Sequence, residues 1–425
     1  MRTQMVQARN IAVIGTLDTK GKEIGFVRDL LAARGHRPVL IDAGIRGAPQ
    51  VSADVTREAV AAAAGTTLDE LLARGDKGAA VQAMARGLAA VVAKLRGEGR
   101  LDAALAIGGA QGSMIAAQAL QELPVGVPKL LVSVIANGQT TFGPFVGTRD
   151  VLVMHSVADI LGLNRLTRKV LTEAAGAIAG MAEIAGPEAE TPRPTIALTM
   201  AGVTTAAAMR LREALDGLGY EVVAFHCNGI GAKAMEDMVE AGELDGIVDL
   251  SPHDVPDGLF GGIMPAHADR LRAPVRHGVP LVFVPGAADF ILYGPFEQLS
   301  TELKARPLVR HNAIHTHVRA TRAEMAAVGR FVGERLRGGR GSSRVVVPMR
   351  GFSQLNVAGG PLHDPEADSG FLAGLRAALA GNTQSGVEII EADLHINDET
   401  FADMLANQID QMVAARRQSP REQQS

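Results

Sequence analysis

Residues 11–20 read Ile-Ala-Val-Ile-Gly-Thr-Leu-Asp-Thr-Lys, and they set the architecture of the first part of the chain. A short apolar run meets glycine at once, and apolar residues then recur at helical spacing from Glu23 to Arg34. Gly35 fits the position just after a helix, and a second β-rich run, Pro38 to Ile41, ends at Asp42. The pattern predicts a strand–helix–strand unit of a parallel sheet, because such crossovers are right-handed.

A similar pattern returns in the second half of the chain. An apolar run begins at Thr195, and a polar turn with Thr204 and Thr205 leads into a helix-like stretch and another apolar run. Further landmarks match in the same order: Leu101-Asp102 with Leu244-Asp245, and Val127-Pro128 with Val279-Pro280. The order predicts an internal duplication. We expect an α/β fold of two similar doubly wound, Rossmann-like domains with mainly parallel sheets, whose ligand sites lie at the carboxyl ends of the strands.

Chain length and a proline-rich segment predict where the domains divide. At 425 residues the chain is longer than one ordinary domain of about 100–200 residues, so two domains are expected. Residues 187–194 hold three prolines and no large apolar side chain, which suits a linker. We therefore expect a first domain over 1–186, a second over 195–413, and a polar tail over 414–425.

The composition excludes several classes of protein. Lys and Arg total 42 against 46 acidic residues, so the net charge of −4 provides no basic surface for nucleic acid or anionic lipid. The lone cysteine, Cys227, rules out an intrachain disulfide. No segment has the apolar length of a signal peptide or a membrane span. We expect a cytoplasmic protein with neither a nucleic-acid nor a membrane partner.

The turn after the first strand carries groups suited to phosphate binding. Gly15 allows a sharp bend, while Thr16, Asp18, Thr19 and Lys20 bring hydroxyls and charges to the start of the following helix. Backbone N–H groups and the positive helix end attract an anion, and the carboxylate would face Mg²⁺ or a ribose. The turn is neither a Walker loop nor a GxGxxG fingerprint. Capping of the helix by Asp18 or Thr19 is the alternative interpretation.

Two later turns should rise from the same edge of the first sheet. One is a glycine run after the strand 105–107, and the other is a polar loop after the strand 130–134. Close packing of helix and strand is the other reason for such glycines. Asp42, at the end of the second strand, is placed either to meet ribose hydroxyls or to form a turn. The candidate ligand residues of these turns are Gly108, Gly109, Gln111, Gly112, Ser113, Asn137, Gly138, Gln139 and Thr140.

Together these segments resemble the UPF0261 family, the Tm-1-like ATP-binding proteins. The resemblance extends from residues 14–20, through 108–113 and 132–140, to His395-Ile396-Asn397-Asp398. It implies two domains, ATP binding in the first half through the three turns, and a homodimer, but no particular reaction. The second half departs from the family pattern where the chain reads Leu250-Ser251-Pro252-His253-Asp254, and where Gly286-Ala287-Ala288-Asp289 replaces Gly-Ala-Leu-Asp. We therefore expect a ligand specific to this subgroup in the second domain.

The second half also supplies candidate catalytic and substrate groups. His253 and Asp254 would act as an acid–base pair, with Asp289 as an orienting carboxylate and Arg319 as an anion clamp. The substrate candidates are Thr204, Thr205, His226, His311, Arg350 and Ser353. His311 and His315 would share one face if their segment is helical, and could then bind a carboxylate or a metal, although no closed set of metal ligands surrounds them. Surface or hydrogen-bonded histidines are the alternative.

Three functions fit these patterns. The first is an ATP-dependent metabolic enzyme, ligase, kinase-like or hydrolase, in which ATP, with Mg²⁺, sits in the first domain and a small anionic substrate sits at an interdomain cleft. The second is a sensor in which ATP controls capture of a macromolecular partner without turnover. The third is an enzyme without a nucleotide, whose first-domain turns bind a substrate phosphate or carboxylate.

Overall fold

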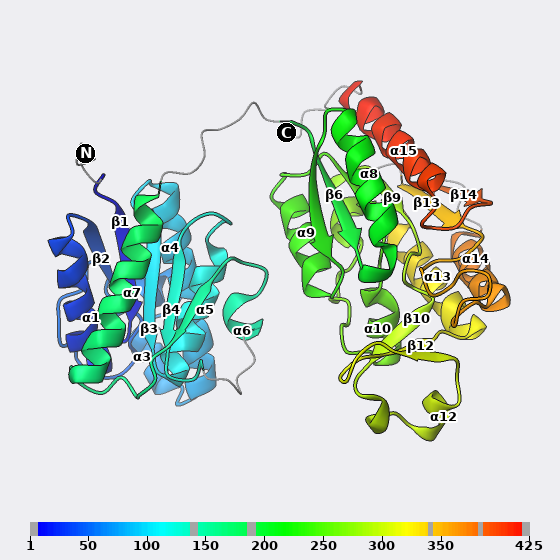
Figure 1. Ribbon diagram of the computed structural model, residues 1–425. Helices are drawn as coiled ribbons and strands as arrows, with labels where there is room; N and C mark the ends of the chain where they lie inside the picture. The colour runs from blue at the N-terminus through cyan, green and yellow to red at the C-terminus, as the bar shows by residue number, and fades with distance from the viewer. Residues whose placement is uncertain (1–6, 137–142, 185–192, 339–342, 381–385, 419–425) are drawn as a thin grey trace, which may run out of the picture. The chain divides into compact units, whose positions relative to one another are not determined.

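The computed structural model describes residues 7–136, 143–184, 193–338, 343–380 and 386–418. The chain forms two compact units, the N-terminal unit Met1–Glu188 and the C-terminal unit Ala189–Ser425 (Figure 1). Each unit is built around one parallel sheet covered by helices. The predicted fold class is confirmed.

The sheet of the N-terminal unit has the strand order β2-β1-β3-β4-β5, with all neighbours parallel. Its strands are β1 (Asn10–Gly15), β2 (Arg37–Asp42), β3 (Ala103–Gly108), β4 (Lys129–Ser133) and β5 (Leu152–His155). Its helices are α1 (Leu17–Ala33), α2 (Arg57–Ala63), α3 (Leu68–Ala73), α4 (Lys77–Gly97), α5 (Ala110–Glu122), α6 (Gly143–Val146) and α7 (Arg165–Glu183).

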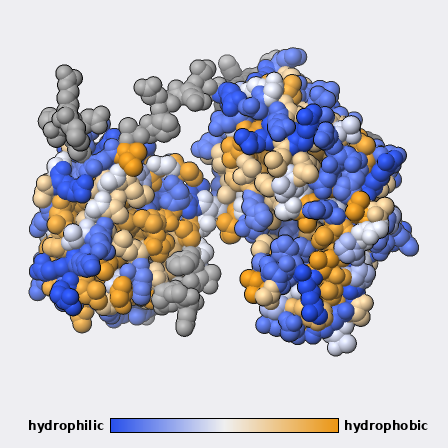
Figure 2. Space-filling view, in the orientation of Figure 1, coloured by the Kyte–Doolittle hydropathy of each residue, from blue (hydrophilic) through white to orange (hydrophobic). Residues whose placement is uncertain are grey.

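Alternate residues of β1 face two separate cores. Ile11 and Val13 pack with α1 and α7, whereas Ala12 and Ile14 pack with α2, α3, α4 and α5. A parallel sheet covered on both faces needs such continuous apolar strands. Apolar residues also reach the surface in patches between hydrophilic ones (Figure 2). Leu152 on β5 and Leu161 before α7 are among the exposed large apolar side chains of this unit.

Contrary to the expectation from the sequence, one helix, α4, has the length and composition of a membrane span, but its packing is that of a core helix. Of its most apolar window, 56% is buried inside the unit. Ala80, Met84, Leu88 and Val92 all lie in the core shared with α2 and α5. Within the described ranges, no other helix passes the same test.

The sheet of the C-terminal unit has the order β7-β6-β8-β9-β13-β14, again with parallel neighbours. Its strands are β6 (Thr195–Met200), β7 (Glu221–His226), β8 (Gly246–Asp249), β9 (Leu281–Phe283), β13 (Ser343–Pro348) and β14 (Val387–Ala392). A separate antiparallel sheet contains β10 (Phe290–Tyr293), β12 (Thr316–Arg319) and β11 (Leu308–Arg310).

Helices cover both faces of the larger sheet of this unit. Helices α8 (Thr205–Gly217) and α15 (Glu399–Gln418) pack on one face of the sheet. Because α15 ends at Gln418, helical structure continues past residue 413, where the polar tail was expected to begin. The opposite core includes side chains from α9 (Ile230–Glu240), α10 (Asp254–Phe260), α11 (Arg272–His277), α13 (Arg322–Leu336) and α14 (Pro365–Leu379). Short helical segments lie at η1 (Gly202–Thr204), η2 (Phe296–Gln298) and α12 (Thr301–Lys304).

The two sheets share the same first five positions, which confirms the duplication. In the N-terminal unit, the backbone N–H of Asn10 donates to Oδ2 of Asp102 at 2.7 Å, and the N–H of Asp102 donates back to the Asn10 carbonyl at 2.8 Å. Thr195 and Asp245 form the same reciprocal pair, both bonds at 2.9 Å. The matching Leu-Asp landmarks therefore have the same role in both units: the aspartate holds the backbone at the start of the first strand.

The units differ in the connection after their second strand. Three helices, α2, α3 and α4, connect β2 to β3, whereas only α9 lies between β7 and β8. Residues 43–102 of the N-terminal unit thus form an enlarged connection, which we call the α2–α4 segment. Because connections at the carboxyl ends of strands line the ligand sites of such sheets, this difference bears directly on where a site forms.

Candidate functional site

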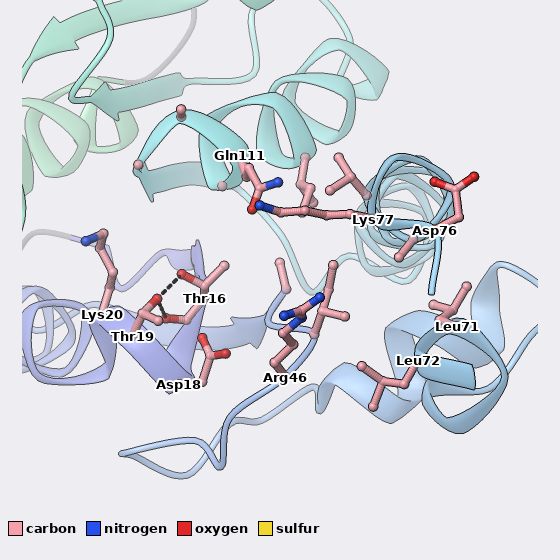
Figure 3. Close-up of a pocket in the computed structure, with 18 of the residues that line it drawn as sticks. Thr16, Asp18, Thr19, Lys20, Arg46, Leu71, Leu72, Asp76, Lys77 and Gln111 are labelled. Carbon is pink, nitrogen blue, oxygen red and sulfur yellow. Dashed lines mark hydrogen bonds between the residues drawn. The ribbon is translucent and has the colours of Figure 1, made fainter. Parts of the chain in front are cut away.

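A cavity of about 530 Å³ opens at the carboxyl ends of β1 and β3 in the N-terminal unit. Three parts of the chain line it: the turn into α1, the start of α5, and the α2–α4 segment (Figure 3). Its size lies within the range of about 300–1,000 Å³ of small-molecule sites. The lining residues from the predicted turns are Thr16, Asp18, Thr19, Lys20, Gly109, Gln111 and Gly112.

The turn after β1 is shaped by close backbone approach. A Cβ atom on Gly15 would lie only 2.8 Å from the carbonyl oxygen of Ile107, so no larger residue fits there. Thr16 is the N-cap of α1, but its side chain makes no capping hydrogen bond. Its hydroxyl instead lies 2.8 Å from the hydroxyl of Thr19. The start of α1 therefore presents two hydroxyls and the amide of Asp18 to the cavity, because the Leu17 amide donates to Asp42 and those of Thr19 and Lys20 donate to the Thr16 carbonyl. Neither Asp18 nor Thr19 acts as the N-cap.

Asp18 has one carboxylate oxygen occupied and one without a partner. Oδ2 accepts a hydrogen bond from the backbone N–H of Gly47 at 3.0 Å. Oδ1 is buried and has no hydrogen-bond partner among the residues that the structure describes. The loop from Gly44 to Gly47 packs so closely over this side chain that a Cβ on Gly44 would lie 3.2 Å from Oδ1. A buried carboxylate oxygen without a partner is costly, and a cation beside it would remove that cost.

Asp42 has a structural position below the cavity. Its side chain is 1% exposed, and Oδ1 accepts from the backbone N–H groups of Leu17, at 3.0 Å, and Gly44, at 2.8 Å. Burial raises its pKa, and these two hydrogen bonds oppose the rise. It is not among the residues that line the cavity. Asp42 therefore joins the turn after β1 to the loop after β2.

The glycine run divides into packing residues and lining residues. A Cβ on Gly108 would lie 2.4 Å from the backbone nitrogen of Ser113, so Gly108 permits the tight turn into α5. The hydroxyl of Ser113 is buried and donates to the hydroxyl of Ser133 at 2.7 Å, which links the start of α5 to the end of β4. Gly109 is the N-cap of α5 without a side-chain cap, so the first amides of this helix remain available at the cavity. Asn137, Gly138, Gln139 and Thr140 lie outside the described residues.

Lys20 lines the cavity with its stem, while its ammonium group is bound elsewhere. Nζ donates to the carbonyl of Ile160 and lies 3.8 Å from the carboxylate of Asp159. A Cβ on Gly109 would lie 3.8 Å from Cε of Lys20, so the two turns are close. In Figure 3 the amine of Lys20 points away from the other labelled cations.

The α2–α4 segment supplies a wall that the sequence patterns did not reveal. Its apolar part is formed by Leu71, Leu72, Ala80 and Val81, with Ile115 of α5 opposite. Two cations complete it, Arg46 from the loop after β2 and Lys77 from the first turn of α4. The position of Arg46, just beyond the carboxyl end of a strand, was an available signal. The helical residues gave none, because their spacing is equally typical of a core helix.

In the C-terminal unit, three of the predicted residues come together. The hydroxyl of Ser353 donates to Oδ2 of Asp289 at 2.7 Å, and Arg319 donates from Nη1 to the Asp289 carbonyl at 2.6 Å. All three are nearly fully buried, and within the described ranges Oδ1 of Asp289 has no hydrogen-bond partner. Burial raises the pKa of Asp289 to about 7, although Arg319 opposes the rise. Arg319 also donates to Asp368 at 2.5 Å.

His253 and Asp254 lie next to each other in the chain but face different partners. Nδ1 of His253 lies 3.1 Å from the carbonyl oxygen of Ala287. The carboxylate of Asp254 accepts from Nε of Arg270 at 2.9 Å and from the thiol of Cys227 at 3.0 Å. Across the described ranges, no hydrogen bond joins the two side chains of the predicted acid–base pair.

Arg270 is the centre of a fully buried ion cluster. Its guanidinium donates to Asp254, to Asp249 at 2.6 Å and to Glu236 at 3.2 Å. Although burial disfavours the charge, these three carboxylates hold the pKa of Arg270 well above its ordinary value. Burial also raises the pKa of the Cys227 thiol far above its usual range, so this cysteine is not a thiolate nucleophile.

The remaining substrate candidates are dispersed. Thr204 is buried, with its hydroxyl 2.6 Å from that of Ser251, and Thr205 donates to the carbonyl of Gly202 at 2.9 Å. His226 is exposed at the end of β7, and Arg350 is paired with Asp393 at the surface.

His311 belongs to a stack of rings on the antiparallel sheet and its connecting loop. Its ring centre lies 5.0 Å from that of His317, which in turn lies 4.3 Å from Phe290. Burial, together with nearby histidines, lowers the pKa of His317 to about 3. The segment 311–315 is not helical, so the helical face considered for His311 and His315 does not form, and their ring centres lie 6.5 Å apart in the stack. No cluster of three or more potential metal ligands occurs among the residues that the structure describes.

The strand ends that correspond to the cavity are covered by the C-terminal unit's own chain. The carbonyl of Val203 accepts from the backbone N–H of Gln354 and from Nδ2 of Asn397, both at 3.0 Å. Leu355 and Val203 pack against a small core that contains Ala201 and Phe290. Residues 202–205, the turn that matches Thr16 to Thr19, are thus covered by loops from later in the chain.

Comparisons with known proteins agree with the resemblance seen in the sequence. Residues 9–187 match the model described as "Uncharacterised protein family (UPF0261) N-terminal domain", and residues 193–413 match that of its C-terminal domain. A UPF0261 protein of Clostridium tetani is 35% identical over 405 residues, 95% of this chain and 99% of that protein. A UPF0261 protein of Rhizobium meliloti is 36% identical over 93% of this chain and 97% of its own length. The ToMV susceptible protein tm-1 of Solanum lycopersicum is 33% identical over 78% of this chain and 44% of its own length.

Proposed function

The chain belongs to the UPF0261 family, and from that premise we propose that its N-terminal unit binds ATP in the cavity above β1 and β3. One observation carries the proposal. Two helices, α1 and α5, begin at the same cavity, and both direct positive dipole ends toward one ligand. Among the described residues, the amides of 110–112 at the start of α5 have no acceptor, whereas α1 contributes the amide of Asp18, because its Leu17 amide donates to Asp42 and those of Thr19 and Lys20 donate to the Thr16 carbonyl. A phosphate is the common biological group that such a pair of helix starts accepts best.

The cavity lining supports a charged ligand with an apolar part. Three cationic residues, Lys20, Arg46 and Lys77, line it against two acidic ones, Asp18 and Asp76. Asp76 is the N-cap of α4 and accepts from the N–H of Ala79 at 3.0 Å. The leucines and valine of the α2–α4 segment offer an aliphatic surface for a nucleoside, since the described lining contains no aromatic ring.

A Mg²⁺ ion carried by the nucleotide fits the residues present. Mg²⁺ commonly binds through one or two carboxylates, the remaining positions being filled by phosphate oxygens and water. Asp18 offers one buried oxygen that lacks a partner in the described part of the chain, and the hydroxyl-bearing Thr16 and Thr19 line the same cavity. The ion would offset the charge of the phosphates.

Thermal unfolding with and without Mg-ATP tests the proposal, with Gly112→Leu as the decisive variant. A Cβ on Gly112 meets only Thr16, at 3.8 Å, so a leucine fits the helix and projects into the cavity. The matched control is Gly176→Leu on α7, where no atom lies within 4 Å of the added Cβ. Saturating ATP at 100 times Kd should stabilise the wild-type protein by about 2.7 kcal/mol.

We expect Gly112→Leu to abolish the ATP-dependent shift while leaving the midpoint without ligand unchanged or higher, because leucine favours helix over glycine. Gly176→Leu should retain the full shift. An ATP shift that survives in Gly112→Leu, or no shift in the wild-type protein, contradicts the proposal.

A second candidate is a nucleotide-dependent sensor that binds ATP without consuming it. Asp289, Ser353 and Arg319 are buried and engaged with one another, which favours this candidate over an enzyme that uses them on a small anionic substrate. Phosphate release from ATP, measured with a panel of carboxylate metabolites, separates the two. Turnover that Asp289→Asn abolishes would establish the enzyme, and tight ATP binding with no turnover would establish the sensor.

A further inference from the structure

The three cations around the cavity are not equivalent. The ammonium group of Lys20 is held by the carbonyl of Ile160 and by Asp159, and the side chain is 12% exposed. A ligand phosphate would have to displace both contacts to recruit it. Arg46 and Lys77 are exposed, and within the described part of the chain no hydrogen bond or ion pair engages either side chain. They are therefore the cations that a ligand meets first.

Arg46 and Lys77 reach the cavity from different elements. Arg46 rises from the loop after β2, and Figure 3 shows its guanidinium between Asp18 and Leu71. Lys77 extends from the start of α4, and its amine ends beside the side chain of Gln111 at the start of α5. The cavity thus has cationic groups in addition to the two helix starts.

One phosphate does not satisfy this arrangement. The starts of α1 and α5 would bind a single anionic group, mainly through the first amides of α5 and the Asp18 amide of α1. Arginine binds phosphate oxygens through two parallel N–H donors, and lysine adds a point charge. Separate anion-binding elements in one cavity favour a ligand whose negative charge extends over several groups in a chain.

We propose that Arg46 and Lys77 make the cavity selective for polyphosphates over monophosphates, with one phosphate at the helix starts and the next between these two side chains. The inference rests on the proposed function, because it concerns the same cavity. Both residues belong to the enlarged connection between β2 and β3, so selectivity resides in the segment that the C-terminal unit does not have.

Isothermal titration of the full chain at constant ionic strength tests the inference, with AMP, ADP, ATP, inorganic phosphate and pyrophosphate as probes. The variants are Arg46→Gln and Lys77→Gln. The matched control is Lys22→Gln, an exposed lysine of α1 that does not line the cavity. Like the two cavity variants, Lys22→Gln removes one positive charge from the N-terminal unit. Circular dichroism spectra of all four proteins should coincide.

In the wild-type protein, ADP should bind at least tenfold more tightly than AMP, and pyrophosphate more tightly than phosphate. Each cavity variant should reduce the ratio of ADP affinity to AMP affinity at least threefold, while changing the AMP affinity itself less than twofold. Lys22→Gln should keep the wild-type ratio of affinities. Equal affinities for AMP and ADP, or ratios that the variants leave unchanged, would refute the inference while ATP binding stands. Pyrophosphate binding that needs both residues, without nucleotide binding, would support the inference and refute the nucleotide proposal. If no probe binds, both fail.

Discussion

Asp289→Asn should flatten the dependence of stability on pH in the C-terminal unit. Burial raises the pKa of Asp289 to about 7, from 3.8 in an unfolded chain. Because the folded pKa is the higher one, the folded state holds a proton that the unfolded state has lost between these values. Stability is therefore present at low pH and lost as pH rises. Proton linkage gives a loss of about 2.5 kcal/mol between pH 5 and pH 8 from this one group.

Urea unfolding at pH 5, 6, 7 and 8 measures the effect. The chain has no tryptophan, and its two tyrosines, Tyr220 and Tyr293, both lie in the C-terminal unit, so tyrosine fluorescence reports this unit alone. His317, with a pKa lowered to about 3, acts in the opposite direction below pH 6.5, but it contributes equally to both proteins. The difference between wild type and variant isolates Asp289. Parallel pH profiles for the two proteins would refute the assignment of a raised pKa to this carboxyl.

Two further substitutions test the packing of each unit. Arg270→Met should destabilise the C-terminal unit by about 3–5 kcal/mol in urea unfolding, because it leaves three buried carboxylates without their cation. Arg350→Met, which removes an exposed ion pair, should leave the midpoint unchanged, and equal losses for both arginines would contradict the role of burial. Gly87→Ala should cost about 1–3 kcal/mol in thermal unfolding, since its Cβ would lie 2.0 Å from the carbonyl oxygen of Val60. Gly97→Ala on the same helix meets no atom within 4 Å, so a comparable loss there would argue against steric overlap.

The parts of the fold that sequence predicts are those fixed by local backbone chemistry. Gly35 and Gly219 end the first helix of each unit with φ angles of 89° and 88°, a conformation that favours glycine, and both positions are visible as sequence signals. The Leu-Asp landmarks were visible as a repeated motif, but their role was not, because Asp102 and Asp245 bind the backbone of strands that begin far away in the sequence.

The candidate site could be predicted only in part, because side-chain direction depends on tertiary contacts. His253 and Asp254 precede and begin a helix, where successive residues point about 100° apart, so adjacency in sequence did not make them a pair. Asp42 ends a strand as expected, but its carboxylate accepts hydrogen bonds from the backbone N–H groups of Leu17 and Gly44 and does not line the cavity. Lys77 was missed because α4 has the pattern of a core helix, and only its first turn reaches the cavity.

The enlarged connection between β2 and β3 has a consequence for how this protein diversifies. The first strands and their Leu-Asp anchors are alike in both units, whereas Arg46, Leu72 and Lys77 are exposed side chains of the enlarged connection. Substitutions at these exposed positions can therefore change the lining of the cavity while the buried contacts of α2, α3 and α4 with the sheet stay as they are.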